Sequence, residues 1–335
     1  MRWRIAAVWA GLVLGALALS GADDSYPLVP SDIGTPGAIP WPDGEVATAA
    51  QIDLGRQLFF DPRLSGTGTV SCATCHDPAK GFADGLVRSV GARGQRVPRH
   101  TPALVNLAWT TVQFWDGRTT DLEQQALGPI TNPLEMDLPR ERLIPRLQRV
   151  PGYRSGFAVA YPEGLTETSV TNALASFERS LVSRHSPFDR YAAGERTALD
   201  PAARRGLALF LDQANCVACH RGPNFTNQSF HNLGLRDQSD PGRAAIMPGA
   251  TLQAAFKTPS LRNIALSAPY FHDGSAATLA EVVAFYNRGG DSDVKSPHIS
   301  ALGLSDEEQR DLVAFLEALT DPMVVERPTL LPDDP

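Results

Sequence analysis

The chain has 335 residues, more than one small hydrophobic core usually holds, and its 43% hydrophobic and 20% charged residues are typical of a water-soluble globular protein. The formal net charge of -7 argues against a nucleic-acid-binding surface, which would need clustered positive charge. Glycine (28) and proline (27) are both numerous, which indicates short elements joined by many loops.

The first 22 residues have the pattern of a secretory signal peptide. Arg2 and Arg4 precede a short apolar stretch, and the small residues at positions 20–22 suit a cleavage site. We therefore expect residues 1–22 to be removed and the remaining chain to work in the bacterial periplasm. An uncleaved membrane anchor is the alternative, although the stretch is short for a full span. No later segment is long and apolar enough to cross a membrane.

All four cysteines fall in two Cys-x-x-Cys-His motifs. Two thiols at this spacing reach the two vinyl groups of one haem and form thioethers, and the adjacent histidine then binds the iron. Two disulfides, a four-cysteine zinc site or dithiol redox centres are alternatives, but each needs the following histidine twice by chance. We therefore predict two covalent c-type haems, one held by Cys72, Cys75 and His76, the other by Cys216, Cys219 and His220.

A short internal repeat indicates that the two motifs belong to two related domains. Gly55-Arg56-Gln57-Leu58-Phe59 precedes the first motif, and Gly206-Leu207-Ala208-Leu209-Phe210 precedes the second. Little of the chain alternates as a strand would, so the predicted fold is mainly α, with two cytochrome c-like domains. We place the first domain at 45–182, a linker at 183–196 and the second domain at 197–325.

Each predicted domain ends in an amphipathic helix. Apolar residues recur at helical spacing at Val170, Ala173, Leu174, Phe177 and Leu181 in the first, and at Leu312, Phe315, Leu316 and Leu319 in the second. Ser305 and Glu308 have the spacing of a capping box at the start of the last helix.

Further short segments occur in a characteristic order along the chain. They are Arg99-His100-Thr101-Pro102, Phe114-Trp115-Asp116-Gly117-Arg118, Gln125-Ala126-Leu127-Gly128-Pro129, Asn132-Pro133-Leu134-Glu135-Met136, Ser186-Pro187-Phe188-Asp189-Arg190-Tyr191, Thr258-Pro259-Ser260-Leu261-Arg262-Asn263 and Pro269-Tyr270-Phe271-His272-Asp273-Gly274. With the haem motifs, these segments make the chain resemble the bacterial di-haem cytochrome c peroxidases, and more closely their branch that includes MauG. The resemblance implies a peroxidase-type oxidoreductase (EC 1.11.1.-) that reduces hydrogen peroxide at the first haem and shares oxidising equivalents with the second.

The resemblance also assigns a peroxide site. It implies that Glu135 is the distal acid–base group, Gln125 a distal hydrogen-bonding residue and Pro129 the wall near the open iron position. A carboxylate in an apolar pocket suits the transfer of a proton between the two peroxide oxygens. Without the resemblance, an exposed loop carboxylate and a polar helix face would be the simpler interpretations. Trp115 matches the tryptophan that lies between the haems of the family, where an indole can carry an electron or a hole.

The two haems are expected to differ in their sixth ligand. The peroxidase branch has a loop histidine that caps the first iron, but no histidine lies between Asp77 and Arg99 here. We therefore expect an open first iron, with His100, which stands where the family usually has asparagine, as a minor alternative ligand. For the second iron the resemblance implies Tyr286, as in MauG, in a helix over 278–288 that begins with a Thr278/Glu281 capping box. Met247 is the runner-up.

The family resemblance further implies a calcium ion between the domains, bound by the backbone carbonyls of Ser267 and Pro269. His100 replaces the asparagine ligand, and calcium prefers oxygen, so this ion is doubtful. The expected partners are hydrogen peroxide and a small redox protein, either a cytochrome c or a cupredoxin, or a protein substrate. A MauG-like enzyme that modifies a partner protein and a non-catalytic di-haem electron carrier are the alternatives.

Overall fold

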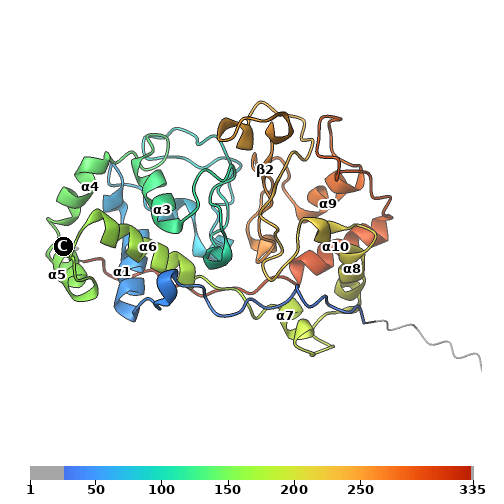
Figure 1. The fold of residues 1–335 in the computed structure, drawn as a ribbon, viewed down its shortest axis with the longest axis horizontal. Coiled ribbons are helices and arrows are strands. Elements are labelled where there is room, and N and C mark those ends of the chain that lie inside the picture. Colours follow the sequence, from blue (N-terminus) through green and yellow to red (C-terminus); the bar gives the residue numbers. More distant parts are fainter. Residues whose placement is uncertain (1–25, 333–335) are drawn as a thin grey trace, which may run out of the picture.

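Residues 26–332 are described by a computed structural model, and they form two helical halves that lie side by side (Figure 1). The predicted signal peptide, residues 1–22, lies outside the described residues. Within them, no helix is long and apolar enough to cross a membrane. The one sheet of the described chain pairs β1 (Phe230–His231) antiparallel with β2 (Phe256–Lys257), so the prediction of a mainly α fold is confirmed.

Each half consists of short helices around its own apolar core. The first half contains α1 (Ala49–Phe60), α2 (Cys72–Cys75), α3 (Leu122–Thr131), α4 (Arg140–Leu147), α5 (Pro151–Ala160) and α6 (Glu167–Ser180). The second contains α7 (Pro187–Ala192), α8 (Pro201–Leu211), α9 (Leu279–Asn287) and α10 (Asp306–Glu317). The predicted capping box of Ser305 and Glu308 is present at the start of α10.

The repeat found in the sequence is also a repeat of helix packing. A Cβ added to Gly55 on α1 would collide with the carbonyl of Ala173 and with Phe177 on α6. A Cβ added to Gly206 on α8 would collide in the same way with the backbone of α10, at the carbonyl of Asp311, and with Phe315. Glycine is therefore required at both positions because the two helix backbones touch there.

The repeat extends into loops that the sequence pattern did not reveal. Two segments that begin with Thr-Pro match each other, residues 101–106 and 258–263. Their last residues, Asn106 and Asn263, both adopt a left-handed backbone, with φ of 58° and 57°. Helices α3 and α9 then follow at the same distance along the chain. In this register Pro129 is the eighth residue of α3 and Tyr286 is the eighth residue of α9. The two residues thus hold equivalent places in the two halves.

Both ends of the described chain cross to the opposite half, forming two straps. The N-terminal strap packs on the second half, where Ile33 joins the core and the Tyr191 hydroxyl donates to the carbonyl of Pro27 at 3.0 Å. The C-terminal strap returns to the first half, where Arg56 donates to the carbonyl of Glu326 at 3.0 Å. Arg63 also donates to the carbonyl of Pro332 at 2.9 Å, and Figure 1 shows this last described segment running back along the first half, far from α10.

The straps and α7 do not follow the domain limits that the sequence suggested. Helix α7 lies inside the predicted linker 183–196, and its Phe188 is fully buried in the second core. Met323 and Val325, at the end of the predicted second domain 197–325, pack on the first core. The segment between the halves is therefore a packed part of the second half rather than a free tether.

We predict that Gly55→Ala destabilises the protein by about 1–3 kcal/mol, because the methyl group overpacks the contact between α1 and α6. Urea unfolding of the haem-loaded protein measures this. Gly37→Ala is the matched control, since nothing lies within 4 Å of a Cβ at Gly37. Equal unfolding free energies for the two variants would contradict the packing argument.

Candidate functional site: a cavity shared by the two haem motifs

A single large cavity lies between the halves and reaches both Cys-x-x-Cys-His motifs. Its volume of about 1370 Å³ exceeds the roughly 300–1,000 Å³ of most sites for one small ligand. The residues predicted for the site all line this cavity: Cys72, Cys75, His76, Trp115, Gln125, Pro129, Glu135, Cys216, Cys219, His220, Ser267, Pro269 and Tyr286. The fold thus brings together residues that are more than two hundred positions apart in the chain.

The two motif histidines are oriented in the same way. His76 Nδ1 lies 2.9 Å from the carbonyl of Phe82, and His220 Nδ1 lies 2.8 Å from the carbonyl of Phe225. A carbonyl only accepts, so each Nδ1 carries the proton and each Nε2 keeps its lone pair for a metal. Burial lowers both pKa values, that of His220 to about 4, so both rings are neutral at pH 7.

The alternatives to haem fit this arrangement poorly. The four cysteines form no disulfide. They lie as two separate pairs, one in each half. Among the residues that the structure describes, no cluster of three or more His, Cys, Asp or Glu side chains could hold a metal ion, which argues against a four-cysteine zinc site. Two thiol pairs, each followed by an oriented neutral histidine at the wall of one large cavity, fit two thioether-linked haems.

The distal residues of the first half lie together on the cavity wall. Glu135 is mostly buried, and its Oε1 accepts a hydrogen bond from Asn132 Nδ2 at 2.8 Å. Burial raises the pKa of Glu135, while the bond from Asn132 and the charge of Arg118 oppose this effect. Gln125 Oε1 is buried and has no hydrogen-bond partner within the described residues, as expected of a group that awaits a ligand.

Tyr286 has the place and burial of a group that faces the second haem. It lines the cavity from α9, and its ring packs against Phe271 and Phe285 at centroid distances of 6.4 and 5.4 Å. Burial raises its pKa. Met247, the alternative ligand, is 54% exposed and does not line the cavity.

The start of α9 differs in one detail from the sequence-based expectation. Thr278 caps the helix by accepting from the backbone of Glu281 at 3.1 Å. The Glu281 carboxylate accepts from the backbone of Ala277, at 2.6 Å, so the full Thr278/Glu281 capping box does not form.

Trp115 lies at the contact between the halves, where the two repeats meet in a reciprocal way. The backbone N–H of His100 donates to the carbonyl of His272 at 2.7 Å, and that of Lys257 donates to the carbonyl of Trp115 at 2.8 Å. Trp115 and His272 hold equivalent places in the repeat, and their rings meet edge to face with centroids 6.5 Å apart. The indole N–H donates to the carbonyl of His100 at 2.8 Å, which fixes the ring.

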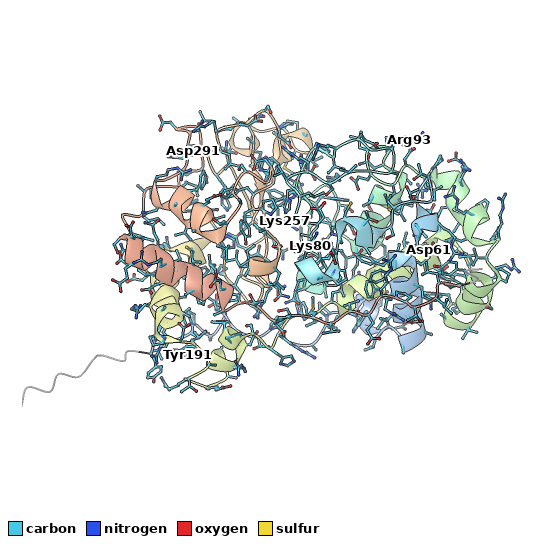
Figure 2. All side chains as sticks on the ribbon, turned by 180° about the vertical axis from the view of Figure 1, so that it is seen from behind. Asp61, Lys80, Arg93, Tyr191, Lys257 and Asp291 are labelled. Atoms are coloured by element: carbon cyan, nitrogen blue, oxygen red, sulfur yellow. The ribbon has the colours of Figure 1, made fainter. Side chains whose placement is uncertain are left out.

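A buried ion network secures the same contact. Arg99 donates to Asp116 at 2.6 Å and to Asp240 at 2.7 and 2.9 Å, and so joins the two halves. Lys257, near the centre of Figure 2, donates its Nζ to the carbonyl of Val112 at 3.0 Å. Burial lowers the pKa of Lys257 to about 8. Cationic groups thus line a cavity that would receive the anionic propionates of haem.

The residues implied for calcium do not fit that ion well. His100 Nδ1 donates to the carbonyl of Leu86 at 2.9 Å, so its imidazole is already engaged within the protein. Imidazole nitrogen is also a poor calcium ligand. Ser267 and Pro269 line the cavity and could offer backbone carbonyls alone. The calcium ion stays an untested prediction, with His100 as the observation against it.

Sequence reasoning missed one buried group on the cavity wall, the carboxyl of Glu178 on α6. Glu178 is 5% exposed and lines the cavity beside the first motif. A usable signal was present, because Glu178 lies four residues after Leu174 on the apolar face predicted for this helix. An acidic residue within a helix face that otherwise enters the core is an anomaly that calls for a specific role.

Comparisons with known proteins agree with this geometry. The profile of the family described as di-haem cytochrome c peroxidase matches residues 49–197, and the profile of cytochrome c matches residues 203–320. The methylamine utilization protein MauG of Methylorubrum extorquens is 45% identical over 304 residues, covering 88% of this chain and 85% of that protein. The cytochrome c551 peroxidase of Pseudomonas aeruginosa is 36% identical over 290 residues, covering 83% and 80%.

Solved structures give the same result. A MauG-like protein associated with microbial copper homeostasis superposes with a TM-score of 0.80 at 33% identity, covering 88% of this chain and 95% of that one. The di-haem peroxidase BthA of Burkholderia thailandensis superposes with a TM-score of 0.72 at 26% identity, covering 87% and 92%.

We predict that a calcium chelator leaves the absorption spectrum of the haem-loaded protein and its reaction with peroxide unchanged, because His100 is bonded to Leu86 and supplies no oxygen ligand. Elemental analysis before and after chelation provides the second readout. His100→Asn restores an oxygen ligand, and it is expected to make the protein take up calcium. Loss of bound calcium together with loss of reactivity in the wild type would show that the ion is present and required.

Proposed function

The chain belongs to the di-haem cytochrome c peroxidase family, which makes it a c-type haem oxidoreductase of the peroxidase class, and we propose that it reduces hydrogen peroxide at the haem held by Cys72, Cys75 and His76. The oxidising equivalents are shared with the haem held by His220 and passed to a protein. In balance, one peroxide molecule takes up two electrons and two protons and yields two water molecules.

One observation carries this proposal: equivalent places in the two halves hold Pro129 and Tyr286. A proline side chain has no atom that binds iron, whereas a tyrosine oxygen binds iron in other haem proteins. Pro129 would therefore leave the first haem accessible to a small ligand, whereas Tyr286 would close the second. In a pure electron carrier, protein side chains would bind both haem irons. The difference between Pro129 and Tyr286 therefore favours catalysis at the first haem.

The neighbouring side chains suit the proton movements of peroxide reduction. The haem iron, when bound, supplies the centre at which the O–O bond breaks. Glu135 would accept a proton from one peroxide oxygen and return it to the other, which departs as water. Gln125 offers its free carbonyl oxygen and its amide to hold peroxide in place. Asn132 fixes the Glu135 carboxylate in one orientation through its 2.8 Å hydrogen bond.

Trp115 supports the sharing of oxidising equivalents. It lies at the contact between the halves, on the wall of the cavity that both haem motifs reach. Its N–H is bonded to a backbone carbonyl, which cannot take the proton away. An indole held in this way passes an electron without losing its proton, which keeps the transfer reversible.

The second candidate function is oxidation of a partner protein, and Tyr286 favours it. An anionic tyrosine oxygen stabilises the higher oxidation state of a haem and lowers its potential, which makes that haem a poor acceptor from a high-potential cytochrome. Under either function the protein partner is a small redox protein, a cytochrome c or a cupredoxin, or a protein substrate. We place the reaction in the periplasm, in line with the predicted signal peptide at residues 1–22 and with covalent haem attachment.

We predict that Glu135→Gln slows the reaction with peroxide by about 10²–10⁴-fold, because glutamine cannot accept the proton. In the wild type the carboxylate form is the active base, and burial raises its pKa. The rate should therefore fall on acidification, at a pH above the usual range of a carboxylate. Stopped-flow absorption measures both effects, with the exposed Glu163→Gln as the control. A wild-type rate in Glu135→Gln would remove Glu135 from the mechanism.

We predict that Tyr286→Met raises the reduction potential of the second haem, because a thioether favours the reduced iron and tyrosine oxygen the oxidised iron. Electron paramagnetic resonance of the oxidised protein should show a changed low-spin signal, and potentiometry should show the higher potential. Tyr270→Phe is the control, since that hydroxyl is bonded to the carbonyl of Ile264 at 3.1 Å. If Tyr286→Met keeps the wild-type spectrum, Tyr286 is not a ligand.

A further inference from the structure

Glu178 is a buried acid on the wall of the haem cavity, and the mechanism proposed above does not use it. Its side chain is 5% exposed, and its Oε2 is buried with no hydrogen-bond partner within the described residues. It lines the cavity beside Cys72, and its charge acts on that sulfur atom, which holds the edge of the first haem. A free carboxyl therefore lies next to a redox centre.

The charged groups around Glu178 only partly offset its burial. Arg179, the next residue on α6, favours the carboxylate of Glu178, but it is engaged with Glu123 of α3 through two hydrogen bonds of 2.5 and 3.0 Å. Glu123 in turn repels a negative charge on Glu178. Burial is the largest cause that raises the pKa of Glu178, to about 8, so the group exchanges a proton near neutral pH.

The second half has no such acid. Glu178 follows Phe177, and Leu316 follows Phe315, the residue that makes the equivalent contact with α8. Leu316 is 8% exposed and lines the cavity as Glu178 does. A leucine satisfies the packing of this helix face, so the carboxyl of the first half is not needed to build the domain. At this place on the helix, the difference gives the first haem motif a proton-binding group that the second motif lacks.

We propose that Glu178 is the redox-linked proton site of the first haem: its carboxylate binds one proton from solvent when that haem gains an electron, and releases the proton when the electron leaves. The oxidised haem carries one more positive charge than the reduced haem. That charge favours the carboxylate, and its removal favours the acid. The electron comes from the redox partner in the cell, or from an electrode in the test below.

This linkage has a defined direction. Above the pKa that Glu178 has beside the oxidised haem, reduction is accompanied by proton uptake, and the potential of the first haem falls as pH rises. The dependence ends where the group is ionised in both states, above the pKa that Glu178 has beside the reduced haem. At pH values below the pKa that Glu178 has beside the oxidised haem, the carboxyl is protonated in both redox states and the potential of the first haem is constant. The inference requires the haem attached through Cys72 and Cys75 but does not depend on the peroxide chemistry.

Spectroelectrochemical titration of the haem-loaded protein at a series of pH values tests this proposal. The wild type should approach one proton per electron for the first haem, about 59 mV per pH unit, between the pKa values that Glu178 has beside the oxidised and the reduced haem. Glu178→Gln should remove the dependence and hold the potential at the acid plateau of the wild type, because the amide is neutral at every pH. The second haem should keep its wild-type behaviour in the variant.

Two further measurements make the result specific. Glu123→Gln keeps Glu178 but removes a repulsion and frees Arg179, so the pH dependence should persist and move to lower pH. The infrared difference spectrum between reduced and oxidised protein should contain a carboxylic acid carbonyl band that Glu178→Gln abolishes. A pH-independent potential of the wild-type first haem, or an unchanged slope in Glu178→Gln, would overturn the proposal even if peroxide reduction proved correct.

Discussion

The pair of reciprocal hydrogen bonds between the halves, from His100 to His272 and from Lys257 to Trp115, is the constraint on which the rest of the site depends. These bonds use backbone groups, so they fix the relative position of the two repeats whatever side chains each repeat carries. They bring Trp115 and His272 into contact and turn both haem motifs toward one cavity. The Arg99 ion network supports the same position, because Asp240 of the second half would lose its partner Arg99 if the halves moved apart.

On this duplicated frame, function arises from the few places where the halves differ. Pro129 and Tyr286 occupy equivalent places on α3 and α9, and the proposed function rests on this difference, with one haem accessible and the other closed by the tyrosine. Glu178 and Leu316 differ in the same manner on the helices that cover the haems. A symmetric pair of cytochrome domains would only transfer electrons. In our proposals, these two differences assign ligand binding and proton exchange to the first half.

The sequence was most informative where a local pattern has one physical meaning. The two haem motifs, the amphipathic helices α6 and α10 and the capping box of Ser305 are of this kind, and the family resemblance added the distal residues. The straps, α7 and the repeat of the loops could not be predicted, because they depend on contacts between distant segments. Lys257 escaped notice because a single charged residue in a loop-rich segment has no periodicity, and only its contacts in the fold show that it is unusual. Glu178 could have been noticed, since it interrupts the apolar face of α6.

The crossing straps have a consequence for how the molecule is made. The first half emerges from the ribosome before the segment that completes its core, since Met323 and Val325 lie near the other end of the chain. The second half, in turn, relies on Ile33, which is synthesised long before the rest of its core. Each half therefore reaches its final packing only after synthesis of the whole polypeptide. A cut at the boundary between the repeats would therefore take Met323 and Val325 away from the first core and Ile33 away from the second.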